Sequence, residues 1–180
     1  GDYVTEARVA PASPAIGLEV GRFAAGNRIG VHGVVRDGRR LFGRLEEAAL
    51  RAGDILLLEA DTATLERALE ENGLELVERS KREPRADGAE LSLMEAVVLP
   101  DAVVQGSSPA SLDLRRRYGV SLVAAARRGR RFEGRLRDAT LSTGDVLLLE
   151  GEADRLRAAI ADLGCLPLAD RRLALEPRRS

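Results

Sequence analysis

Residues 53–59 of the chain read GDILLLE, and residues 144–150 read GDVLLLE. A short aliphatic run bounded by turn formers is typical of a strand that is buried on both faces. The aspartate before each run is expected to cap free backbone amides in the preceding turn. The two segments therefore predict central strands at residues 55–59 and 146–150.

The similarity between these segments extends over most of the chain. Further matches follow in the same order, pairing residues 6–11 with 95–100, 28–31 with 117–120, and 38–45 with 129–136. The offset is 89 residues in the earlier pairs (117 − 28) and 91 residues in the later ones (129 − 38), which indicates a second strand that is two residues shorter in the first copy. An ordered set of matches of this kind indicates an internal repeat.

The repeat predicts two tandem modules. We place the first module at residues 2–79 and the second at residues 91–170. Residues 80–90 between them are polar and rich in turn formers, which predicts a linker. Residues 171–180 form a basic tail.

Each module is expected to contain the same series of elements. Strands are expected at residues 4–10, 31–36, 39–42, 74–77, 93–99, 120–127, 130–133 and 165–168, and helices at residues 18–25, 62–72, 110–116 and 153–163. Asp37-Gly38 and Arg128-Gly129 are expected to form two-residue hairpin turns, which require positive φ angles. The fold class is therefore α+β: two small modules, each a mostly antiparallel sheet with helices packed on one face.

The composition excludes several functional classes. The 28 basic residues nearly balance the 29 acidic ones, and aromatic residues make up 3% of the 180 residues. We therefore expect no nucleic-acid partner, because a basic face and base-stacking platforms are missing. The sequence has no Cys/His metal spacing, no catalytic triad, no phosphate-binding loop and no apolar run of ~18 residues. We expect no enzyme activity and no cofactor.

The ordered motifs resemble the RCK C-terminal domain, also called the TrkA-C domain. That family carries an apolar strand ending in proline, Tyr-Gly-Val, an Arg-x-Gly hairpin and a Gly-Asp-x-Leu-Leu-Leu strand before a helix. The second copy carries them as EAVVLP at 95–100, RYGV at 117–120, RRG at 127–129 and LSTGDVLLLEG at 141–151. The first copy departs from the pattern at Ile29 and Ala60, which replace the tyrosine and the last glycine.

The resemblance implies a ligand-sensing or gating domain on the cytosolic side of a membrane transport protein. Tandem copies without an adjacent Rossmann domain are similar to the insert of divalent-anion/sodium symporter-type permeases. The implied partners are a transmembrane domain of the same polypeptide, a second module in a homodimer or an intrachain pseudo-dimer, and a small anionic or nucleotide ligand such as cyclic di-AMP. The alternative function is purely structural dimerisation without a ligand.

The ends of the sequence indicate a fragment of a longer protein. The chain begins at Gly1, and its tail carries Arg171, Arg172, Arg178 and Arg179. Basic residues beside a membrane span favour the cytoplasmic side. We therefore expect the native chain to continue into a hydrophobic segment after Ser180, with this domain at the cytoplasmic face of the inner membrane.

Four types of polar residue have a structural interpretation. A structural role is favoured for the lone His32 over a pH switch. We interpret Glu59 and Glu150, at the ends of the central strands, as partners of nearby arginines. Cys165 is the only cysteine, and a small buried residue is favoured over a nucleophile. The many arginines near the two hairpins are explained either by a solvated sheet edge or by an anion site, with nucleic acid disfavoured.

The candidate ligand-binding residues are Asn27, Arg28, Arg116 and Arg117. They lie where the first helix of each module meets the second strand, so that backbone amides and guanidinium groups can converge on one phosphate or carboxylate. The alignment of Arg28 with Arg117 motivates the choice, and the resemblance implies a position between paired modules. The alternative is that both arginines pair with acids such as Glu59 and Glu150.

Overall fold

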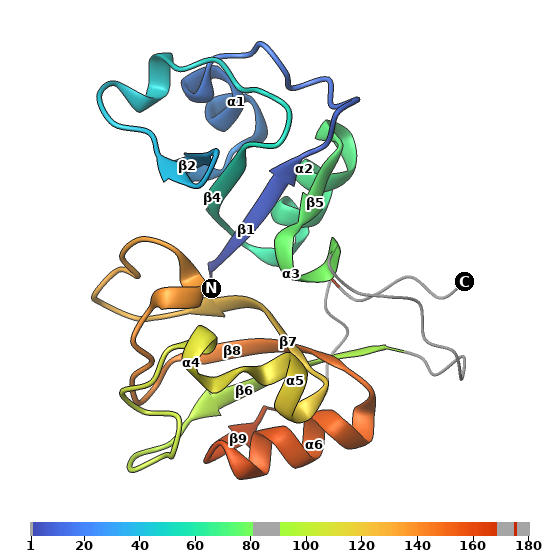
Figure 1. The fold of residues 1–180 in the computed structure, drawn as a ribbon, viewed down its shortest axis with the longest axis vertical. Helices are drawn as coiled ribbons and strands as arrows, with labels where there is room; N and C mark the ends of the chain where they lie inside the picture. The colour runs from blue at the N-terminus through green and yellow to red at the C-terminus, as the bar shows by residue number, and fades with distance from the viewer. Residues whose placement is uncertain (1, 81–90, 169–174, 176–180) are drawn as a thin grey trace. The chain divides into compact units, whose positions relative to one another are not determined.

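Both leucine-rich segments form the central strand of an antiparallel sheet (Figure 1). In the computed structural model, which describes residues 2–80, 91–168 and 175, the segments are β4 (Ile55–Ala60) and β8 (Val146–Gly151). Their leucines are buried on both faces, as the sequence predicts for a central strand.

The chain divides into two compact units, Gly1–Lys81 and Arg82–Ser180. The predicted modules fall one in each unit. The predicted linker at 80–90 and the tail at 171–180 lie outside the described residues, apart from Ser80 and Leu175.

In the first unit the strand order is β3-β2-β4-β1-β5, and all these pairings are antiparallel. The outer strands are β1 (Tyr3–Val9), β2 (Gly30–Arg36), β3 (Arg39–Arg40) and β5 (Leu74–Leu76). The helices are α1 (Val20–Asn27), α2 (Thr62–Asn72), α3 (Val77–Ser80) and the short 3₁₀ helix η1 (Leu45–Glu47). Helix α2 packs against β4 and β5, and α1 packs against β2 and η1.

In the second unit the strand order is β7-β8-β6-β9, again antiparallel. The outer strands are β6 (Ser92–Val98), β7 (Ser121–Ala126) and β9 (Cys165–Pro167). The helices are α4 (Pro109–Leu112), α5 (Leu114–Tyr118), α6 (Ala153–Asp162) and the 3₁₀ helix η2 (Leu136–Asp138). Helix α6 packs against β6, β8 and β9. The mostly antiparallel α+β fold is thus as predicted.

Local caps explain the ends of the helices. The carboxylate of Asp61 accepts a hydrogen bond from the Thr64 amide at the start of α2, and Gly73 ends that helix with a φ of 57°. Ser108 caps α4 in a capping box, with Pro109 as the first helical residue, as the Ser-Pro pair indicates.

The predicted helix at residues 110–116 is wrong in one respect, because it is two short helices. Asp113, with a φ of 49°, separates α4 from α5. Aspartate is among the few residues that enter the left-handed region at low cost, so it can end one helix and begin another.

The predicted third strands are also corrected. In the first unit Asp37 (φ 52°) and Gly38 (φ 78°) form the expected hairpin, but β3 covers only Arg39–Arg40. In the second unit residues 130–133 form no strand. Only Gly129 of the Arg128-Gly129 pair has a positive φ, and the Phe132 ring is buried beneath the Arg127 guanidinium, 4.1 Å from its Cζ atom. The chain therefore turns inward instead of returning along β7.

Strand pairing corrects the position of the two additional residues. Gly30 faces Glu59 and Ser121 faces Glu150, an offset of 91 residues already at the start of the second strands (121 − 30). Both strands also have a bulge at the same place, between Val31 and Gly33 and between Leu122 and Ala124. The extra residues therefore precede β7, and β2 is not the shorter strand.

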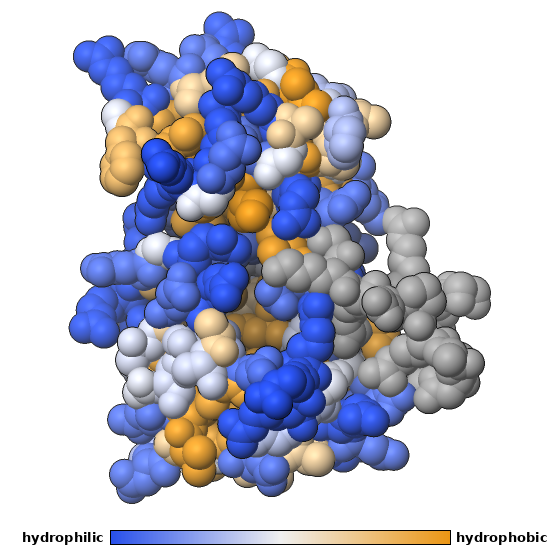
Figure 2. All heavy atoms as spheres, in the orientation of Figure 1, coloured by the Kyte–Doolittle hydropathy of each residue, from blue (hydrophilic) through white to orange (hydrophobic). Residues whose placement is uncertain are grey.

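The viewed surface is mainly hydrophilic, with apolar side chains in separate areas (Figure 2). In the part of the chain that the structure describes, the exposed large apolar residues are Ile16, Leu18, Phe42, Leu99, Val103, Leu166 and Leu168. Among the described residues, none of the helices has the length and apolar character that crossing a membrane requires.

We predict that Gly164→Ala destabilises the second unit by about 3 kcal/mol, through left-handed strain and overpacking. Gly164 has a φ of 77°, and an added Cβ atom would lie 2.8 Å from Cα of Ala102. Urea unfolding followed by circular dichroism and hydrogen exchange measures the loss.

Gly129→Ala is the matched control, because Gly129 has a φ of 80° but no atom within 4 Å of an added Cβ. It should cost only the backbone strain, about 1 kcal/mol. Equal losses in the two variants would show that the contact with Ala102 is unimportant.

Candidate functional site

The aspartate before β8 is the centre of a hydrogen-bond network in the second unit. Asp145 Oδ1 accepts from Arg127 Nε at 2.8 Å, and Oδ2 accepts from Arg127 Nη2 at 2.8 Å. The same Oδ2 accepts from the Ser142 amide at 2.8 Å, and Arg127 Nη2 also donates to the Thr140 carbonyl at 2.7 Å. The side chain of Asp145 is 2% exposed and that of Arg127 is 11% exposed, so the two form a nearly buried bidentate ion pair.

The first unit repeats this network with every member shifted by 91 residues. Arg36 Nε and Nη2 donate to Asp54 at 2.8 and 2.9 Å. Arg36 also donates to the Ala49 carbonyl at 2.9 Å, and Asp54 accepts from the Arg51 amide at 2.8 Å. The predicted role of these aspartates as caps of free amides is confirmed.

The ion pairs keep both arginines charged. Hydrogen bonding to Asp54 raises the pKa of Arg36, and hydrogen bonding to Asp145 raises the pKa of Arg127, while burial opposes both shifts. The guanidinium of Arg127 is also covered by the Phe132 ring. The counterpart of Phe132 in the first unit is Leu41 (132 − 91), so the first pair has no such aromatic cover.

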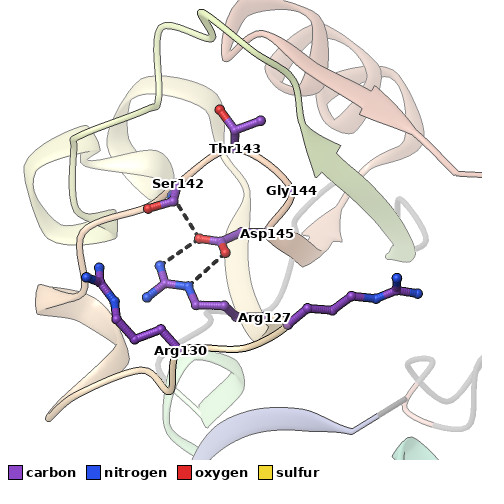
Figure 3. Close-up of a pocket in the computed structure, with 7 residues that line it drawn as sticks. Arg127, Arg130, Ser142, Thr143, Gly144 and Asp145 are labelled. Carbon is purple, nitrogen blue, oxygen red and sulfur yellow. Dashed lines mark hydrogen bonds and ion pairs between the residues drawn. The ribbon is translucent and has the colours of Figure 1, made fainter.

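An open pocket of about 330 Å³ lies over the ion pair of the second unit (Figure 3). It is lined by Arg127, Arg128, Arg130, Ser142, Thr143, Gly144 and Asp145. Figure 3 shows Arg127 directed at Asp145, with Ser142 on the other side of the carboxylate. This hairpin region is one of the arginine-rich segments for which the sequence left an anion site open.

The candidate ligand residues of the first unit lie at the end of α1. Asn27 is engaged within the fold: its Nδ2 donates to the Phe23 carbonyl at 2.8 Å, and its Oδ1 accepts from Asn72 Nδ2 at 2.9 Å. Arg28 is the left-handed cap of α1, with a φ of 56°, and its amide donates to the carbonyls of the last turn.

The candidates of the second unit lie on α5. Arg116 is exposed and pairs with Asp113 at 2.5 Å, while the Arg117 guanidinium lies over the Tyr118 ring at 5.4 Å. The four residues thus form one adjacent pair in each unit. Whether they contact a ligand stays a prediction.

The alignment that motivated these residues is wrong. The left-handed residue that ends the helix is Arg28 in the first unit and Gly119 in the second, with φ angles of 56° and 69°. Both precede the second strand by the same number of residues, so Arg28 corresponds to Gly119 and not to Arg117. By the same offset of 91 residues, His32 corresponds to Val123.

The interpretation of Glu59 as an arginine partner is also wrong. Its carboxylate contacts His32 Nε2 at 2.5 Å, across the neighbouring strands β4 and β2. This contact agrees with a structural role for His32. Glu150, at the matching position of β8, is fully buried.

The described residues include no cluster of three or more His, Cys, Asp or Glu side chains that could hold a metal ion. Cys165 is buried in β9, where desolvation raises the pKa of its thiol to about 11. At neutral pH the thiol is therefore protonated, which is the expected state of a structural cysteine and not of a nucleophile.

Sequence analysis missed the arginine–aspartate pairs, although it contained a signal for them. Arg36 and Arg127 differ by 91 positions, as do Asp54 and Asp145. These charged residues repeat with the same 91-residue spacing as the buried central strands. Such a repeat indicates that each charged residue has an equivalent partner in both units. Comparing charged positions between the two copies would therefore have identified both pairs.

Part of the second unit is similar to the TrkA-C domain. Residues 93–164 match the family model of that domain, and the match spans β6 to the end of α6. A crystal structure of the GsuK RCK domain aligns over 91% of this chain and 64% of that chain, with 10% identity and a TM-score of 0.36.

Relatives of the chain are transporters. It is 28% identical over 160 residues to the uncharacterized transporter sll0640 of Synechocystis, 31% over 135 residues to sodium/sulfate cotransporter 2 of Chlamydomonas reinhardtii, and 27% over 150 residues to the uncharacterized transporter YfbS of Escherichia coli. These alignments cover 83%, 67% and 79% of this chain, but only 26%, 15% and 25% of the relatives. The chain therefore spans about a quarter of their length or less.

We predict that Asp145→Asn lowers the stability of the second unit by about 3 kcal/mol, because the nearly buried Arg127 loses its counter-charge. Urea unfolding at pH 7 measures the change. Asp138→Asn is the matched control: Asp138 is exposed and 3.9 Å from Arg137, so the change should be within ~0.5 kcal/mol. Similar small losses in both variants would mean that the buried pair contributes little.

We predict that the Cys165 thiol reacts slowly with Ellman's reagent at pH 8 in the folded chain and at the rate of a free thiol in 8 M urea. Because the folded pKa of about 11 exceeds the ordinary 9.0, unfolding releases a proton between these values. Stability should therefore fall as the pH rises from 9 to 11. Fast labelling of the folded chain at pH 8 would contradict the burial of the thiol.

Proposed function

We propose that the chain is a regulatory domain of a membrane transporter, built from two TrkA-C-like modules. The observation that carries the proposal is the TrkA-C match at residues 93–164, inside a region similar to three transporters. Because the chain spans only part of each relative, regulation of an attached transmembrane part is a more fitting role than transport by these residues themselves.

The first unit supports the tandem arrangement. Its order β2-β4-β1-β5 corresponds strand by strand to β7-β8-β6-β9, and the bulge and the arginine–aspartate pair recur at the same offset. We therefore propose residues 2–79 and 91–170 as two modules of one type, joined by a linker at residues 80–90.

The proposed location is the cytoplasmic face of the membrane, with the transmembrane part of the same polypeptide as partner. Regulation would operate through differential affinity: a ligand that prefers one arrangement of the domain shifts the population of the attached transporter. One relative is named as a sodium/sulfate cotransporter, so an inorganic anion is the first solute to test.

Uptake of radiolabelled sulfate by vesicles that contain the complete gene product tests this role. Replacing residues 2–168 by a flexible linker should leave a transporter whose rate no longer responds to cytosolic solutes. An unchanged response, or a complete protein without transport activity, would contradict a regulatory role.

A purely structural dimerisation domain is the second candidate, because modules with small cores often bury a remaining apolar surface by pairing. Thermal melts with a panel of nucleotides and dicarboxylates separate the two functions. A sensing domain should gain about 2.7 kcal/mol from a ligand at 100 times its dissociation constant. A structural dimer should show no ligand effect but a melting temperature that rises with protein concentration.

The candidate residues Asn27, Arg28, Arg116 and Arg117 are tested in the same assay. Arg117→Ala should weaken ligand binding without lowering the melting temperature of the free chain if Arg117 contacts a ligand. A lowered melting temperature without a ligand effect would assign a structural role to Arg117.

A further inference from the structure

The two units differ in charge at one turn beside the buried ion pair. The second unit reads Arg127-Arg128-Gly129-Arg130, and the first reads Arg36-Asp37-Gly38-Arg39. The first and last arginines are therefore shared, whereas Arg128 replaces an aspartate. This substitution changes the formal charge of the turn by two units.

The pocket of the second unit has an excess of positive charge. The charge of Arg127 is compensated by Asp145, whose two oxygens accept three hydrogen bonds. Arg128 and Arg130 line the same pocket and are exposed. In the part of the chain that the structure describes, neither of these two guanidinium groups makes an ion pair or hydrogen bond.

We propose that this pocket binds a small tetrahedral oxyanion, phosphate or sulfate, through Arg128 and Arg130. Guanidinium groups present several donors in a fixed plane and are suited to oxyanions. In the same lining, Ser142 adds a hydroxyl donor and Thr143 a backbone N–H. The Ser142 amide is already held by Asp145, and the Thr143 hydroxyl donates to Gln105 Oε1 at 2.7 Å. Asp145 does not oppose the anion strongly, because its charge is already neutralised by Arg127.

The lining indicates an oxyanion rather than a nucleotide. Its seven residues include no aromatic side chain on which a base could stack, since Phe132 is buried beneath Arg127. None of the four candidate residues at the end of α1 and on α5 lines this pocket. The proposed anion binding also does not depend on the proposed role in a transporter.

The first unit supplies the internal control. Asp37 places a carboxylate at the position of Arg128, and it lies in a closed hairpin with β3. A like charge at this position disfavours an anion. The proposal therefore assigns the site to the second unit alone.

Isothermal titration calorimetry on the 180-residue chain tests the site, with sodium phosphate, sodium sulfate and sodium chloride as titrants at constant ionic strength. Constant ionic strength is required because general screening by salt would otherwise resemble weak binding. Arg128→Asp introduces the residue of the first unit, and Arg130→Ala removes the second guanidinium. Arg39→Ala, at the position that corresponds to Arg130 (130 − 91), is the charge-matched control.

Phosphate or sulfate should bind with one site per chain, and chloride should not. Arg130→Ala should weaken binding roughly tenfold, as expected for the loss of one charge-assisted contact, and Arg128→Asp should abolish it. Arg39→Ala should leave the affinity unchanged. Because neither pocket arginine has a partner in the described part of the fold, the melting temperatures of the free variants should match that of the unmodified chain.

Two results would overturn the proposal. One is the absence of heat from phosphate and sulfate beyond that of chloride. The other is an equal loss of affinity in Arg39→Ala and Arg130→Ala, which would indicate a general charge effect. A preference between phosphate and sulfate, with the losses above, supports the site and names the anion.

Discussion

In each unit a carboxylate that is nearly inaccessible to water holds one arginine through both of its oxygens. A buried carboxylate is costly unless it is paired and fully hydrogen-bonded. Asp145 therefore requires Arg127 at the end of β7, while the Thr140 carbonyl and the Ser142 amide fix the loop between them. One interaction thus determines how the second strand, the following loop and the central strand meet. In the first unit, Arg36 and Asp54 form the equivalent interaction.

This constraint separates residues that cannot change from residues that can. Arg127 is engaged by Asp145, so it is not available to a ligand, and its counterpart Arg36 is retained. The residue that follows this arginine takes no part in the buried ion pair, and it is Asp37 in the first unit and Arg128 in the second. New binding properties can therefore arise beside the buried pair without loss of the fold, which is why the charge difference between the units is informative about function.

Much of the fold could be predicted from local sequence, because the deciding signals are local. The leucine runs identified β4 and β8, and the helical spacing with a glycine stop gave the bounds of α2 (Thr62–Asn72). The candidate site was less predictable, because an arginine and an aspartate 18 positions apart show no periodicity (145 − 127). The alignment of Arg28 with Arg117 failed because it rested on residue identity, whereas a left-handed backbone joins Arg28 to Gly119.

The same constraint explains where the two additional residues lie. The segment in question is the helical one that precedes the second strand of each unit. At its start, the carbonyls of Leu18 and Ser107 accept equivalent backbone hydrogen bonds, and at its end Arg28 and Gly119 are the helix caps. The first segment advances by ten residues (28 − 18) and the second by twelve (119 − 107). Because pairing to the central strand and the ion pair fix the second strand at both ends, the extra length must be absorbed upstream of it, where Asp113 divides the helix. The arginine-rich helix α5 arises at this break, so the module can vary its charged surface there while the sheet remains unchanged.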